Sequence, residues 1–145
     1  MNVMNFSTHD MDFNTVLLIS QDDEMAGLLK TLFEKRNCRF ISETTGKNGL
    51  ASAKLLCPSL IILDLNLPNK ELLNLCQDLR GTTNGALLVY NSDHRMPDLS
   101  ELHLVGVDEI ITAPISPMAL LIKSLSWLAR QDWIVPRRQP MELYI

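Results

Sequence analysis

The sequence predicts an α/β domain in which helices cover both faces of a sheet of five parallel strands. Short apolar runs of strand length alternate with longer segments whose apolar residues recur at helical spacing, and this pair occurs five times. Such an alternation is typical of a parallel sheet whose strands are joined by right-handed crossovers. The chain has 145 residues, 46% of them apolar, which suits one globular domain with short flanks.

The expected strands are short, and three of them are apolar at nearly every position. Strands inside a parallel sheet are buried on both faces, so their sequences lack the alternation of a half-exposed strand. The second segment has the weakest pattern. In chain order, the expected strands are residues 16–20, 39–42, 60–63, 86–90 and 109–111.

The segments between these strands carry apolar faces at helical spacing. Pro58 ends the second helix, because the residue before a proline leaves the helical region. Gly81 is the expected C-cap of the third helix, and Ser116 followed by Pro117 begins the last. The expected helices are residues 23–36, 46–57, 70–80, 97–105 and 116–129.

The two flanks are expected to lie outside the domain, which spans residues 15–130. Residues 1–14 lack the basic and apolar blocks of a secretory signal and are interpreted as a flexible leader. Residues 131–145, QDWIVPRRQPMELYI, contain two prolines and two arginines. We interpret them as a linker or as the start of an effector domain.

Composition argues against several functions. The net charge of −4 and the pI of about 5.3 disfavour a general nucleic-acid surface on this domain. The sequence has no apolar stretch of about 18 residues, so no membrane span is expected. The three cysteines, Cys38, Cys57 and Cys76, have no CxxC spacing and favour reduced thiols in a cytoplasmic protein.

Acidic residues follow two of the expected strands at their carboxyl ends. Asp22 and Asp23 come after the first strand, and Asp64 ends the third in LIILDLNLP. Parallel strands place these ends along one edge, where ligands of such sheets bind, so the three carboxylates are expected to converge. They need a counter-charge, and Mg²⁺ suits them, with the backbone carbonyl of Asn66 as a further oxygen. The alternative, that Asp22 and Asp23 only favour a helix N-terminus, leaves Asp64 unexplained.

Four motifs, SQDDE, TGKNGLASA, LDLNLP and GVDEIITAPI, lie at the expected first strand end, second helix, third strand and fifth strand. Through them, residues 15–130 resemble the receiver domain of two-component response regulators. The resemblance implies a flavodoxin-like, doubly wound sheet with strand order 2-1-3-4-5. It also implies that Asp64 accepts a phosphoryl group from a histidine kinase, and that Asp22, Asp23, Asp64 and Asn66 hold Mg²⁺ beside it.

Three positions on the switch side of the site depart from that family. Ala113 stands where the family has a lysine before the proline, and Ile110 stands where it has an aromatic residue. Asn91, followed by Ser92, stands where the family has a threonine or serine after the fourth strand. The acidic side is retained while the switch side is replaced, which indicates an atypical receiver, or pseudo-receiver.

Two functions fit these residues. The first is a signalling module that acts through protein association, with a histidine kinase or another signalling protein as partner. Its homodimer would form through the fourth helix, fifth strand and fifth helix. The second is a conventional Mg²⁺-dependent receiver that a histidine kinase phosphorylates on Asp64. In both, DNA binding and transcription regulation would belong to an effector domain beyond the linker.

An independent enzyme on this architecture is not expected. A phosphohydrolase with an aspartate nucleophile would need a second acid two residues after Asp64, where this chain has Asn66. The SQDDE loop is acidic rather than glycine-rich, so without a metal it would repel the phosphates of a nucleotide. The sequence also lacks a Ser-His-Asp or zinc-ligand pattern.

Overall fold

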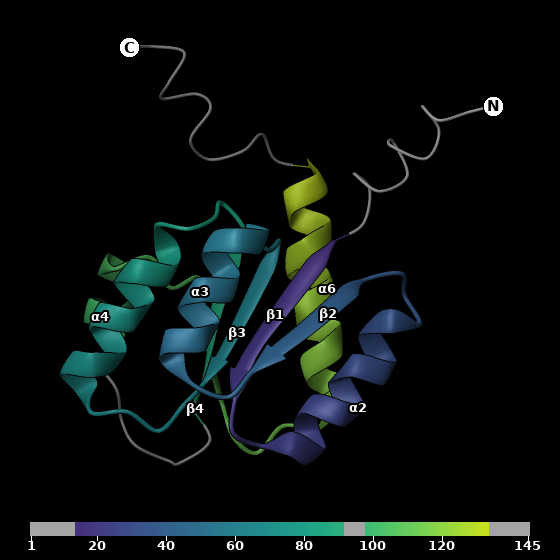
Figure 1. Ribbon diagram of the computed structural model, residues 1–145, viewed down its shortest axis with the longest axis horizontal. Helices are drawn as coiled ribbons and strands as arrows, with labels where there is room; N and C mark the ends of the chain where they lie inside the picture. Colours follow the sequence, from purple (N-terminus) through teal and green to yellow (C-terminus); the bar gives the residue numbers. More distant parts are fainter. Residues whose placement is uncertain (1–13, 92–97, 134–145) are drawn as a thin grey trace, which may run out of the picture.

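The computed structural model of the protein describes residues 14–91 and 98–133, with side chains as far as residue 130. Its strands form one parallel sheet in the order β2-β1-β3-β4-β5 (Figure 1), which confirms the fold class and the strand order. The strands are β1 (Thr15–Ser20), β2 (Arg39–Glu43), β3 (Leu60–Asp64), β4 (Ala86–Asn91) and β5 (Glu109–Thr112).

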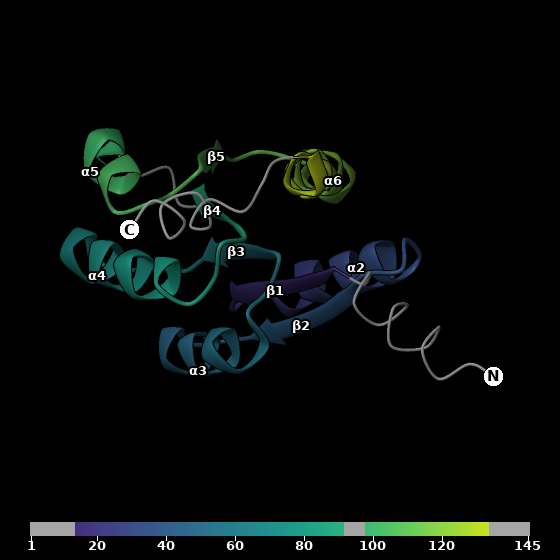
Figure 2. The same ribbon diagram turned by 90° about the horizontal axis from the view of Figure 1, so that it is seen from above.

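The helices of the described residues form a layer on each face of the sheet. Figure 2 shows α2 and α6 together on one side, and α3, α4 and α5 on the other. This arrangement is the doubly wound architecture that the alternating sequence pattern predicts. The helices are α2 (Asp23–Glu34), α3 (Gly46–Leu56), α4 (Asn69–Arg80), α5 (Leu99–Leu104) and α6 (Pro117–Trp133).

Short polar side chains cap the N-termini of four helices. Asp22, Thr45 and Asp98 cap α2, α3 and α5, each by accepting a hydrogen bond from the backbone N–H three residues ahead. Ser116 does the same for α6, as predicted. Because Asp98 is the cap of α5, this helix begins at Leu99, later than the sequence pattern predicted.

The last helix ends later than predicted. It continues to Trp133, so the first residues of the segment 131–145, which we interpreted as a linker or the start of an effector domain, are helical. The rest of that segment lies outside the described residues, as do residues 1–13 of the expected leader and residues 92–97.

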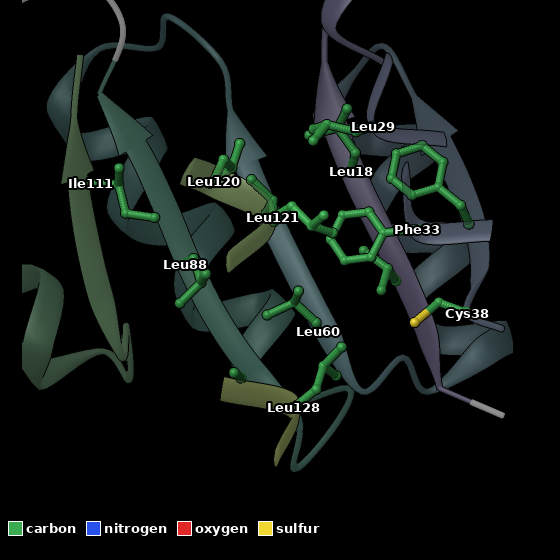
Figure 3. Packing of buried hydrophobic residues seen from close by; sticks show 14 residues of the cluster. Leu18, Leu29, Phe33, Cys38, Leu60, Leu88, Ile111, Leu120, Leu121 and Leu128 are labelled. Atoms are coloured by element: carbon green, nitrogen blue, oxygen red, sulfur yellow. The ribbon is translucent and has the colours of Figure 1, made fainter. Parts of the chain in front are cut away.

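β3 lies at the centre of the sheet and is buried on both faces, as its unbroken apolar sequence predicts. Alternate residues of a strand point to opposite faces. Leu60 and Ile62 belong to the cluster under α2 and α6 (Figure 3), and Ile61 and Leu63 belong to the cluster on the opposite face. Asp64 follows this run and therefore leaves the core at the carboxyl edge of the sheet.

Arg80, the last residue of α4, ties this helix to the amino ends of β4 and β5. Its guanidinium donates hydrogen bonds to the carboxylate of Asp108 at 3.1 Å and to three backbone carbonyl oxygens. Those carbonyls are on Thr83 at 2.7 Å, on Gly106 at 3.1 Å and on Gly85. The hydrogen bonds of Arg80 therefore lie at the amino ends of the strands, away from the acidic residues at the carboxyl ends.

Candidate functional site

A cavity of about 540 Å³ opens at the carboxyl ends of the strands. It lies where strand order reverses between β1 and β3, the position at which open α/β sheets bind their ligands. Apolar side chains of α2 and of the segment after β5 form part of its wall. Its polar lining consists of Gln21, Asp22, Glu24, Asp64, Asn66 and Tyr90.

Asp64 and Asp22, both predicted site residues, are brought together at this cavity. Asp64 is half-buried at the end of β3, and its Oδ2 accepts a hydrogen bond from the hydroxyl of Ser20 at 2.8 Å. The same hydroxyl oxygen accepts a hydrogen bond from the backbone N–H of Asp22 at 3.0 Å. A buried serine therefore connects the two acids, a contact that the sequence pattern did not indicate.

Asp23 has a different place from the one we expected. It is the first residue of α2, exposed, and is not among the described residues that line the cavity. Gln21 lines the cavity instead, so an amide stands beside Asp22 where the motif SQDDE suggested a second acid. Asp22 also caps α2, because its side chain accepts a hydrogen bond from the N–H of Met25 at 3.0 Å. Asp22 therefore both lines the cavity and stabilises the N-terminus of a helix, the role that the sequence offered as an alternative.

Asp22, Asp64 and the backbone oxygen of Asn66 are the residues that would hold Mg²⁺. Across the part of the chain that the structure describes, no group of three His, Cys, Asp or Glu side chains forms a metal cluster. Mg²⁺ does not need one, because it commonly binds one or two carboxylates and keeps several waters. When bound, it would neutralise charge on the oxygens of a phosphoryl group at Asp64.

On the switch side, the cavity is lined by Tyr90 rather than by Asn91. Neighbouring residues of a strand face opposite sides, so only one of the two can point into the cavity. Asn91 pairs with Thr112 of β5, and its carbonyl oxygen accepts from the N–H of Ala113 at 3.1 Å. Ser92, the other expected switch position, lies outside the described residues.

The remaining switch positions offer no charge or ring to the cavity. Ile110 is half-buried and packs against the core cluster under α3, α4 and α5. Ala113 is half-buried directly after β5. Among the described residues that line the cavity, none is a lysine, arginine or histidine, whereas Asp22, Glu24 and Asp64 are carboxylates.

The Tyr90 phenol is electrostatically coupled to these acids. Burial raises the pKa of Tyr90 above its ordinary value, and the nearby charges of Asp64 and Asp22 raise it further. A hydrogen bond with the backbone of Ile115 acts in the opposite direction on this pKa. The phenol is therefore neutral at neutral pH.

A spectrophotometric titration tests this coupling. The chain has two tyrosines, Tyr90 and Tyr144, so the tyrosinate absorbance lost in Tyr90→Phe isolates the Tyr90 transition. We expect that transition above the ordinary pKa of about 10, and closer to this value in Asp64→Asn. Because the folded pKa is raised, the unfolded chain loses this proton first, and the free energy of unfolding falls as pH rises through that window. An Asp64→Asn titration identical to the wild type would contradict the coupling.

The fold and this acidic edge define a signalling domain of known class. Residues 16–124 match the family model of the response regulator receiver domain, and the chain belongs to this family. Receiver domains of two-component systems interact with histidine kinases and effector domains, and they generally bind Mg²⁺.

The relatives include regulators of Escherichia coli strain K12. The chain is 27% identical over 120 residues to the transcriptional regulatory protein RstA, covering 82% of this chain and 49% of that protein. It is 28% identical over 116 residues to the aerobic respiration control protein ArcA, covering 79% and 48%. The chain thus spans about half the length of these curated relatives.

Solved structures show the same fold. A CheY-like response regulator receiver domain protein from Methanospirillum hungatei JF-1 superposes with a TM-score of 0.70 at 21% identity. The match covers 83% of this chain and 98% of that one.

The helices of the described residues are too short or too polar to span a membrane.

Proposed function

We propose that this chain is an atypical receiver domain that signals through protein association and depends little on a phosphorylation switch. The observation that carries the proposal is the cavity around Asp64, whose described lining contains three carboxylates and no cationic side chain. Gln21, which lines the cavity, is uncharged, and the altered positions Ala113 and Ile110 supply no charge or aromatic ring.

The chemistry of phosphoryl transfer supports a weak response. A carboxylate oxygen of Asp64 would form a bond to phosphorus while the bond from phosphorus to the donor oxygen breaks, and acetate would leave acetyl phosphate with that electron pair. The incoming group is an anion, and like charges in one site oppose each other. Mg²⁺ held by Asp22 and Asp64 would be the main counter-charge, because Ala113 provides none.

A conformational switch requires a ligand that binds one state better than the other. The half-buried Ile110 has no ring to reorient, and Tyr90 is bonded to the backbone of Ile115. A phosphoryl group on Asp64 would then make few contacts that differ between two states. We infer that the population shift on phosphorylation is small.

The face formed by α5, β5 and α6 is proposed as the homodimer surface. It carries exposed apolar side chains, and its acid Glu109 is bonded within the chain to Lys123 and to Trp127, both at 2.7 Å. An exposed apolar surface of this kind suits a twofold dimer, the commonest oligomer. The exposed fractions are 54% for Leu99, 85% for Leu104, 47% for Met118 and 60% for Ile122.

The relatives suggest what the domain would control. RstA is a transcriptional regulatory protein, and it is about twice as long as the region that matches this chain. We propose that this domain acts with an effector of that kind, to which DNA binding and transcription regulation would belong. Its upstream partner would be a histidine kinase or another signalling protein in the cytoplasm.

Incubation with Mg²⁺ and acetyl phosphate tests the proposal. We expect intact-mass spectra to show slow, incomplete gain of one phosphoryl group that is absent in Asp64→Asn. Size-exclusion chromatography should give the same oligomeric state with and without the phosphodonor. Full modification together with a change of oligomeric state would instead establish the second function, a conventional receiver phosphorylated on Asp64.

A further inference from the structure

Ser20 is a buried polar residue in the middle of the acidic site. It is the last residue of β1, lies opposite Asp64 in the parallel ladder with β3, and is 3% exposed. A buried hydroxyl costs free energy unless it is hydrogen-bonded. Its neighbours along the strand are apolar core residues, so packing alone would favour another apolar side chain here.

The Ser20 hydroxyl uses both of its hydrogen-bonding roles. Its proton is donated to Oδ2 of Asp64 at 2.8 Å, and its oxygen accepts the backbone N–H of Asp22 at 3.0 Å. Each bond polarises the hydroxyl in the sense that strengthens the other. A side chain without this hydroxyl cannot make either contact.

The connection extends into the first helix. The Asp22 side chain accepts the N–H of Met25 at 3.0 Å, and its carbonyl accepts the N–H of Ala26 at 3.0 Å. A continuous chain of hydrogen bonds therefore runs from the Asp64 carboxylate through Ser20 and Asp22 to the first turn of α2.

We propose that Ser20 is a positioning residue that fixes the Asp64 carboxylate and the Asp22 backbone relative to each other and so links the acceptor site to the start of α2. The role of Asp64 as acceptor rests on the function proposed above, whereas the hydrogen-bonded link does not. This hydrogen-bonded contact lies on the side of the site formed by β1 and α2, whereas the altered switch positions follow or belong to β4 and β5.

The test uses Ser20→Ala with Ser124→Ala as its matched control. Ser124 is also fully buried, and its hydroxyl donates to the carbonyl of Leu120 at 2.8 Å, but this bond lies within α6. In Ser20→Ala, nuclear magnetic resonance should show the Asp22 amide proton moved upfield with faster hydrogen exchange, and a changed carboxyl carbon shift for Asp64. Ser124→Ala should leave these signals unchanged.

Phosphorylation provides a second readout. With acetyl phosphate and Mg²⁺, we expect Ser20→Ala to be modified several-fold more slowly than the wild type, and Ser20→Thr, which keeps the hydroxyl, to recover most of the rate. If the wild type is not modified at all, the acceptor role of Asp64 is excluded, but the resonance comparison still decides the role of Ser20. Asp22 and Asp64 signals that are unaltered in Ser20→Ala, or equally altered in Ser124→Ala, would overturn the inference.

Discussion

Arg80→Ala is expected to lower the free energy of unfolding by about 3 kcal/mol, the lower end of the range for a buried ion pair that loses one partner, because this pair is partly buried. The side chains of Arg80 and Asp108 are only 20% and 15% exposed. Removal of the guanidinium leaves the Asp108 carboxylate and three backbone carbonyls without their donor. The carboxylate would keep the hydrogen bond that it accepts from the N–H of Leu87 at 2.8 Å.

Urea unfolding of Arg80→Ala and Lys30→Ala measures the difference. Lys30 pairs with Glu34 at 2.9 Å on the surface of α2, where the two side chains are 57% and 49% exposed. An exposed pair of this kind contributes about 0–1 kcal/mol. Similar unfolding midpoints for the two variants would show that the Arg80 contacts do not hold α4 and the strand ends together.

Ala113→Lys is expected to raise the rate of Asp64 phosphorylation by acetyl phosphate by about tenfold, which corresponds to about 1.4 kcal/mol in the barrier. Ala113 follows β5 at the same edge of the sheet as Asp64. A lysine at this position would bring a positive charge to a cavity that is lined by carboxylates. It would oppose the repulsion that the incoming anion meets there.

Ala113→Met separates charge from length in this experiment, because methionine is long and unbranched but neutral. The initial rate of the mass gain is measured for both variants at the same Mg²⁺ concentration. Equal rates for the two variants, or no gain in Ala113→Lys, would show that the missing cation is not what limits phosphorylation.

The fold was predictable because its signals are local and repeated. The unbroken apolar run from Leu60 to Leu63 has the length of a strand and the composition of one covered on both faces, and it is the centre of the sheet. Pro58 and Ser116 marked a helix end and a helix start that the structure confirms. The end of α6 was harder to predict from the sequence, because no proline or glycine stops the helix before Trp133.

The residues of the site were harder to predict than the fold, because an error of one position in the sequence changes which side chain is expected in the cavity. The predicted acid pair included Asp23, yet the structure brings Gln21 and Asp22 to the cavity. Asn91 was predicted from its spacing to Pro114, whereas Tyr90 is the residue that lines the cavity. Because β4 is buried on both faces, its own pattern does not distinguish Tyr90 from Asn91. The register with β3, which pairs Val89 with Leu63, places Tyr90 at the level of Asp64.

Ser20 illustrates a contact that one strand cannot reveal. Its partner Asp64 lies on a neighbouring strand, and the register that sets them opposite each other is a property of the folded sheet. The available signal was a hydroxyl at the end of the apolar run of β1. A polar residue in that position predicts a partner, although it does not identify which one.

The direction of α6 decides how this domain can be attached to a surface without obstruction of the acidic edge. β1 begins and α6 ends at the same end of the sheet, opposite the end where β1 meets α2 (Figure 1). The 17 residues of α6 cover about 25 Å at 1.5 Å per residue. A biosensor tether or fluorescent group joined at the end of α6 would therefore leave from the end of the sheet opposite the cavity, and we expect immobilised protein to keep the acidic edge accessible to Mg²⁺ or a partner.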